Sequence, residues 1–235
     1  MASALALSAC SGGGPTQTVG TCEGGSGKET AGENLLKNPG FENGTDPWIT
    51  LEPASGFVVS WEQAHSGASS ALLKMRDPAG ASGAKVYYLV QEMNPAQFPD
   101  VLEGYYCVEN WNKGTIRQYL QFVVIAIGPD NFPTTAANFQ LRYILAGIDS
   151  PPFPINNARF IFITKEEPAT GNWVHFSANI KEDFERLWGA APAGYEKLRL
   201  LFEVRWDGKA AGDGAPEADV YYDDLYTGLP VGEDP

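Results

Sequence analysis

The alternation of apolar and polar residues in the second half of the chain predicts β-strands. Residues 198–206 show it most clearly, because every second side chain there is a large apolar one. One face would carry Leu198, Leu200, Phe202, Val204 and Trp206, and the other Arg199, Leu201, Glu203 and Arg205. One apolar face and one mixed polar face is typical of a strand that covers a core on one side.

The same period of two recurs in residues 117–126, 140–146 and 173–180, and shorter strands are predicted at residues 57–61, 71–75 and 218–226. Several such strands indicate a sandwich of two sheets. Only residues 182–188 predict a helix, as a short connection. Three turn-rich segments are expected to lie at the ends of the sandwich, namely residues 128–133, 150–154 and 207–216.

Size and composition fit one domain. The chain has 235 residues and a net charge of −13, with 26 Gly and 17 Pro. We expect a single β-sandwich domain at residues 34–229, preceded by a Gly/Ser-rich flexible tether at residues 11–33 and followed by a C-terminal tail at residues 230–235. The acidic charge argues against nucleic acid as a partner, since phosphate binding needs clustered Lys and Arg.

The N-terminus resembles a bacterial lipoprotein signal. Leu7, Ser8, Ala9 and Cys10 follow a run of small apolar residues, in the order of a lipobox. The stretch lacks the usual Lys or Arg at its start, and an Ala-rich leader with no such role is the alternative. The resemblance implies a signal segment at residues 1–10, lipidation of Cys10, and a location at the bacterial cell envelope or outside the cell. Contact with a membrane would then be through the lipid anchor.

The other two cysteines, Cys22 and Cys107, match no metal-ligand spacing. They could pair in an oxidising compartment, but the sequence alone does not decide this.

Both ends of the expected domain resemble one family. The first stretch runs Asn34-Leu-Leu-Lys-Asn-Pro-Gly-Phe-Glu42, followed by Trp48 and by Ala64-His-Ser-Gly67, and the last runs Val220-Tyr-Tyr-Asp-Asp-Leu225. These motifs resemble the carbohydrate-binding-module superfamily of families 4, 9 and 22. Residues 34–75 and 218–226 carry the resemblance, and the middle of the chain matches poorly. It implies an all-β fold, a two-sheet antiparallel jelly-roll β-sandwich of the galactose-binding-like type, with its first and last strands side by side.

The resemblance also implies a structural calcium ion where the chain's ends meet. The matching positions are Glu42, the turn at Ser66, and Asp223 or Asp224. Calcium takes six to eight oxygen ligands, which carboxylates and turn carbonyls supply. Successive side chains of a strand face opposite ways, so Asp223 and Asp224 could share a site only if the strand is distorted, and Asp223 fits better. The alternative is that these carboxylates merely solvate a strand edge.

A second candidate is a ligand-binding face on the polar side of the strands. Aromatic rings can stack on sugars, and planar polar groups can pair with hydroxyls. The predicted contact residues are Trp111, Tyr119, Gln121, Arg142, Trp173, Glu203 and Arg205. Of the other tryptophans, Trp48, Trp61 and Trp206 are expected in the core and Trp188 between helix and sheet. The alternative is ordinary cross-strand packing on an exposed sheet.

The sequence gives little support for catalysis. The chain has two histidines, His65 and His175, in no nucleophile or metal-binding pattern. A carboxylate pair such as Glu109 and Glu203 would be needed for glycoside hydrolysis. The expected function is therefore non-catalytic binding of a polysaccharide or glycoconjugate. The alternatives are a structural or assembly module that binds another surface protein, and a glycan hydrolase or lyase.

Overall fold

The computed structural model describes residue 22 and residues 32–52, 55–133 and 135–229. Cys10, the signal segment, the tail at residues 230–235 and nearly all of the tether lie outside these residues. In the described part, strands alternate with loops and one helix. The strands are β1 (Phe57–Ser60), β2 (Ser70–Arg76), β3 (Gly83–Met93), β4 (Val101–Asn112), β5 (Gln118–Ile127), β6 (Asn138–Ala146), β7 (Ala158–Phe162), β8 (Trp173–Asn179), β9 (Lys197–Lys209) and β10 (Glu217–Gly228), and the helix is α1 (Ile180–Trp188).

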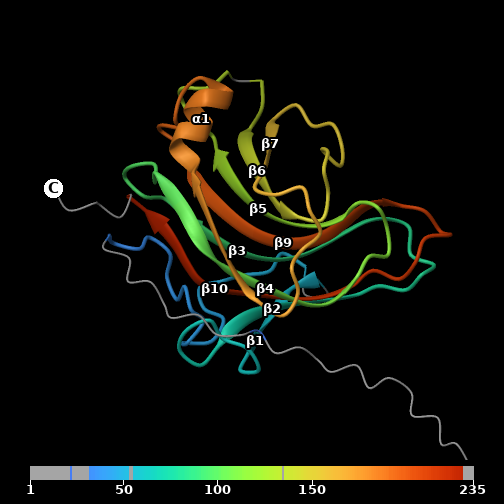
Figure 1. The fold of residues 1–235 in the computed structure, drawn as a ribbon. Coiled ribbons are helices and arrows are strands. Elements are labelled where there is room, and N and C mark those ends of the chain that lie inside the picture. The colour runs from blue at the N-terminus through green and yellow to red at the C-terminus, as the bar shows by residue number, and fades with distance from the viewer. Residues whose placement is uncertain (1–21, 23–31, 53–54, 134, 230–235) are drawn as a thin grey trace, which may run out of the picture.

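The strands form two five-stranded sheets that pack face to face (Figure 1). The first sheet has the order β1-β2-β10-β4-β8 and the second β3-β9-β5-β6-β7. The predicted fold class, an all-β jelly-roll sandwich, is confirmed. One pairing departs from the antiparallel expectation, because β7 runs parallel to β6. The chain between them therefore has to cross back from one end of the sheet to the other.

The core lies between the sheets and is rich in aromatic rings. Phe122, Phe176 and Phe202 meet there, with ring centroids 5.2 to 6.3 Å apart. The predicted core residues Trp48 and Trp206 are buried. The placement of Trp61 in the core was wrong, since its side chain is 76% exposed. Strand β1 ends at Ser60, so Trp61 lies just beyond the edge strand of the first sheet.

Residues 34–42 lie beside the last strand, as predicted, but they do not form a strand. The Leu35 amide donates to the Thr227 carbonyl at 2.9 Å, and the Leu225 amide donates to the Pro39 carbonyl at 3.2 Å. Phe41 has a φ of 61°, which an extended strand cannot contain. The segment is thus held to β10 by separate hydrogen bonds.

Helix α1 confirms the one helix predicted, beginning two residues earlier. The Asn179 side chain caps its first turn by accepting from the Glu182 amide, and Gly189 ends it in the left-handed conformation. Trp188 packs edge-on against Phe139 of β6, with ring centroids 4.9 Å apart, which is the expected contact between helix and sheet. With nine residues, α1 is too short to cross a membrane, and the described residues contain no other helix that could.

A disulfide joins Cys22 to Cys107 of β4. The neighbouring β4 residues Tyr106 and Val108 face the core, so Cys107 faces outward from the first sheet. Cys22 is buried there against Leu72 and Tyr221. Position 22, within the expected tether, is therefore fixed to the outer face of the first sheet.

Candidate functional site

Four of the predicted ligand residues meet on the outer face of the second sheet. Tyr119 and Gln121 lie on β5, directly opposite Arg205 and Glu203 of β9. Their neighbours Leu120, Phe122, Phe202 and Val204 face the core, so these four side chains point away from it. The alternation of apolar and polar residues therefore assigned this face correctly.

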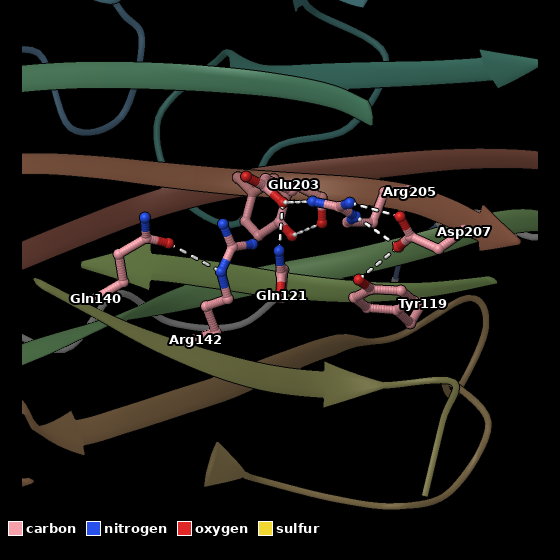
Figure 2. Close-up of polar contacts among 8 residues, drawn as sticks. Tyr119, Gln121, Gln140, Arg142, Glu203, Arg205 and Asp207 are labelled. Atoms are coloured by element: carbon pink, nitrogen blue, oxygen red, sulfur yellow. Dashed lines mark hydrogen bonds and ion pairs between the residues drawn. The ribbon is translucent and has the colours of Figure 1, made fainter. Parts of the chain in front are cut away.

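These side chains form one hydrogen-bonded network with Asp207 (Figure 2). Arg205 donates to both carboxylate oxygens of Asp207, from Nε at 2.9 Å and from Nη2 at 2.7 Å. It also donates to Glu203 at 3.3 Å, and the Tyr119 hydroxyl donates to Asp207 at 2.7 Å. Gln121 Nε2 completes the network by donating to Glu203 Oε2.

Asp207 was missed by the sequence analysis because the strand was expected to end at residue 206. Strand β9 continues to Lys209, which places Asp207 on the same face as Glu203 and Arg205.

Arg142 of β6 reaches the same network from the neighbouring strand. Its backbone lies opposite Val123 of β5, and its side chain extends toward Glu203 and Gln121 (Figure 2). Its Nε donates to the Gln140 side chain at 3.0 Å. Burial, the largest influence on Arg142, lowers the pKa of its guanidinium.

The network is buried rather than open as a stacking platform. Tyr119 and Gln121 are 0% exposed and Glu203 is 3% exposed. Phe153, from the connection between β6 and β7, lies against the guanidinium groups of Arg142 and Arg205, 5.6 and 5.3 Å from its ring centroid. The expectation that residues 150–154 lie at an end of the sandwich was therefore wrong, because the parallel β6–β7 crossover carries Phe153 over the sheet.

Two polar atoms in this network have no partner. Gln121 Oε1 and Arg142 Nη1 are buried and make no hydrogen bond within the described residues. Leaving a buried acceptor or donor unpaired costs about 1–3 kcal/mol, and more for a charged group. The face thus holds one buried acceptor and one buried charged donor that are both unpaired.

Trp111 and Trp173 do not join this face. The Trp111 indole donates to Glu167 at 2.9 Å, at the rim of a cavity of about 280 Å³ lined by Lys113, Ile148 and Glu167 among others. Trp173 lies on β8 of the first sheet and packs beside the Cys22–Cys107 disulfide. Sequence alternation does not give the strand order, so it could not separate Trp111 and Trp173 from the predicted ligand-binding face.

The residues predicted to hold calcium gather around the turn at residues 65–69. Asp223 Oδ2 accepts from the amides of His65 and Ser66 at 2.7 and 3.2 Å, and Glu42 Oε1 accepts from those of Ala68 and Ser69 at 2.9 and 3.0 Å. Two carboxylates from opposite ends of the chain are therefore held by one turn.

Asp224 reaches the same turn because β10 is distorted there. Asp224 has a φ of 47°, and the register against β4 shifts between Asp223 and Tyr226. Its carboxylate lies 2.6 Å from His65 Nδ1 and accepts from the Ser66 hydroxyl at 2.6 Å. The distortion required for Asp223 and Asp224 to face one site is present.

The donor set fits calcium in type, because carboxylate, hydroxyl and turn carbonyl oxygens are the ligands that this ion prefers. Burial and the charge of Asp224 raise the pKa of Asp223 to about 7, and a nearby cation would oppose both effects. In the described part of the chain, no three His, Cys, Asp or Glu side chains are placed to hold a metal alone. A calcium ion here would also need main-chain carbonyls or water.

The carboxylate pair considered for hydrolysis does not form. Glu109 lies on the first sheet opposite Asp219, whereas Glu203 lies on the second sheet beside Gln121. The two face away from the core on different sheets, so they do not flank one bond.

No protein-family model and no curated protein sequence matches the chain. Several solved structures resemble it at low identity. The module TmCBM61 in complex with β-1,4-galactotriose is 13% identical, with a TM-score of 0.44 over 83% of this chain and 97% of that one. The CBM22-1 xylan-binding domain of Paenibacillus barcinonensis Xyn10C is 19% identical, with a TM-score of 0.40 over 87% and 99%. A cellulase derived from Cel12A of Rhodothermus marinus is 12% identical, with a TM-score of 0.40 over 73% and 84%.

Proposed function

We propose that this protein binds a polysaccharide or glycoconjugate, without catalysis, at the outer face of the second sheet. The observation that carries the proposal is the unpaired acceptor Gln121 Oε1 together with the unpaired donor Arg142 Nη1. A sugar hydroxyl both donates and accepts, so vicinal hydroxyls could satisfy the two atoms together. The carboxylates of Glu203 and Asp207 hold the surrounding side chains in place.

The aromatic surface for such a ligand is Phe153, rather than the Trp111 and Trp173 of the sequence analysis. Its ring covers Arg142 and Arg205 and packs edge-on against the ring of Phe160 of β7, with ring centroids 5.6 Å apart. A sugar that reaches Gln121 would therefore have to move this ring aside or stack on it.

A glycan panel on the full chain tests the proposal, followed by titration calorimetry with Phe153→Ala. We expect the substitution to weaken binding about tenfold, the loss of one aromatic contact. Trp61→Ala is the matched control, because Trp61 is exposed at the edge of the other sheet. A panel without any binding would contradict the function, and loss of binding in Trp61→Ala alone would contradict the face.

A second candidate is an assembly module that packs against another protein. It is favoured by Trp61 and Val58, which are 76% and 56% exposed at the edge strand β1 of the first sheet. A glycan-negative panel together with a pull-down that Trp61→Ala abolishes would support it.

We also propose that a calcium ion binds Glu42, Asp223 and carbonyl oxygens of the turn at Ser66. A bound ion would neutralise the buried Asp223 carboxylate and hold the N-terminal segment to β10. An ion that binds only the folded state at 100 times its Kd stabilises it by about 2.7 kcal/mol. Thermal unfolding in calcium should therefore show a higher Tm than in chelator.

Asp223→Asn should remove the calcium-dependent part of the Tm and also lower the value in chelator, because an NH2 group would replace an oxygen that accepts from main-chain amides. Asp213→Asn, in the separate turn before β10, is the control and should keep the full calcium response. Equal Tm values for the wild type in calcium and in chelator would contradict the site.

A further inference from the structure

Arg142 differs from the other arginines on the outer face of the second sheet. Arg205 lies between the carboxylates of Glu203 and Asp207, and Arg199 pairs with Glu92 at 2.6 Å. Arg142 donates instead to the neutral side chain of Gln140. Within the described residues, no carboxylate forms an ion pair with Arg142, although its Nη1 atom is buried.

The position of Arg142 is costly for the protein alone. Its Nη1 is buried with no acceptor, and burial lowers the pKa of the guanidinium. The negative charge of Glu203 opposes this effect and the positive charge of Arg205 adds to it, but Glu203 forms no ion pair with Arg142. A water molecule could satisfy the N–H group but would not supply a charged partner in direct contact. An anionic acceptor would do both, and the planar guanidinium matches a carboxylate in two parallel hydrogen bonds.

The chemistry around Arg142 also fits a sugar rather than a simple anion. Gln121 Oε1 is an unpaired acceptor, which a carboxylate cannot satisfy but a hydroxyl can. Phe153 provides an apolar ring over the same guanidinium. A ligand with a carboxylate, hydroxyls and a ring with C–H faces would match all three.

We propose that the ligand of this face is an acidic polysaccharide, in which Arg142 holds the carboxylate of a uronic acid unit and Gln121 Oε1 accepts from a neighbouring hydroxyl. This inference rests on the proposed glycan-binding function and names its substrate class. The net charge of −13 repels a polyanion at long range, but salt at about 0.15 M screens charges beyond about 8 Å. A contact pair at Arg142 is little affected by that screening.

The test compares polymers that differ only at the carboxyl group, which is either a charged free acid or a neutral methyl ester. Polygalacturonate and alginate are titrated into the full chain at physiological salt, each beside its methyl-esterified counterpart. We expect the wild type to bind at least one free acid tenfold or more tightly than its ester. Arg142→Gln should reduce that ratio to near one, and Arg142→Lys should leave an intermediate ratio because it keeps the charge but not the planar fork.

Arg199→Gln is the matched control, since Arg199 lies on the same face but is already paired with Glu92; it should keep the wild-type ratio. Unfolding by urea confirms that each variant is folded. Equal or tighter binding of the esters, or binding confined to neutral glycans, would overturn the inference and leave the proposed function standing. An absence of binding to every acidic and neutral polymer would overturn both.

Discussion

Glu109 shows how a single buried charge can affect this fold. It is 5% exposed, lies opposite Asp219 on β10 and accepts from Gln63 Nε2 at 3.2 Å. Burial, then the charges of Asp219 and Glu62, raise the pKa of Glu109 above its ordinary value. The folded state therefore holds the proton of Glu109 more tightly than the unfolded state does.

We predict that Glu109→Gln stabilises the protein more at pH 7 than at pH 4. Because the pKa of Glu109 is higher in the folded state than in the unfolded state, its ionisation destabilises the fold once the pH exceeds the pKa of the unfolded state. Glutamine cannot ionise and avoids this loss. At pH 4 the carboxyl is largely protonated in the folded state, so the difference in free energy of unfolding between Glu109→Gln and the wild type should shrink. Urea unfolding of both proteins at the two pH values measures it, and a gap that is larger at pH 4 would contradict the prediction.

The sequence predicted the direction of a side chain correctly where the residue lies in a strand with alternating apolar and polar positions. Tyr119, Gln121, Glu203 and Arg205 were assigned to one face because alternation fixes which way a side chain points. Phe153 could not be found in this way, since it lies on a loop without a period. The pairing of Cys22 with Cys107 likewise depends on a contact across 85 residues of sequence.

At the scale of elements, the connection between β6 and β7 decides what covers the network. Gly147 begins it with a φ of 105°, and a Cβ atom there would lie 2.6 Å from the Gln118 carbonyl oxygen. Only glycine fits both the conformation and the space. The connection is thereby held against the start of β5.

We predict that Gly147→Ala destabilises the protein by about 2 kcal/mol or more, because backbone strain and a main-chain clash add. Gly171→Ala is the matched control, with a φ of 75° but open space around its Cβ position, and it should cost about 1 kcal/mol. Urea unfolding compares the two variants. If both variants lose the same free energy of unfolding, the close packing of Gly147 against β5 contributes nothing to stability.

The strands that sequence patterns missed are those with no clear polar face. In β3, Tyr87, Tyr88, Leu89 and Val90 are all buried, so the period of two is lost. In β4, burial alternates at residues 101–106, but Cys107 is buried on the outer side beside Cys22, Leu72 and Tyr221. Alternation reveals a strand where one of its faces carries polar side chains, and in β3 large apolar or aromatic side chains occupy both faces at residues 87–90.

At the scale of the whole molecule, the Cys22–Cys107 disulfide joins the N-terminal region to the middle of the first sheet. A crosslink across 85 residues removes many conformations from the unfolded chain. In the folded state it also keeps Cys22 packed on Leu72 and Tyr221, which would otherwise be more exposed. Both effects favour folding.

We predict that Cys107→Ser lowers the free energy of unfolding by about 3 kcal/mol. Cys22→Ser should cost a similar amount, and the double variant should cost little more than either, since each change removes the same bond. Urea unfolding of the wild type with and without a reducing agent provides an independent measurement. A midpoint that does not move on reduction, or losses that add in the double variant, would show that the two cysteines act separately rather than as a crosslink.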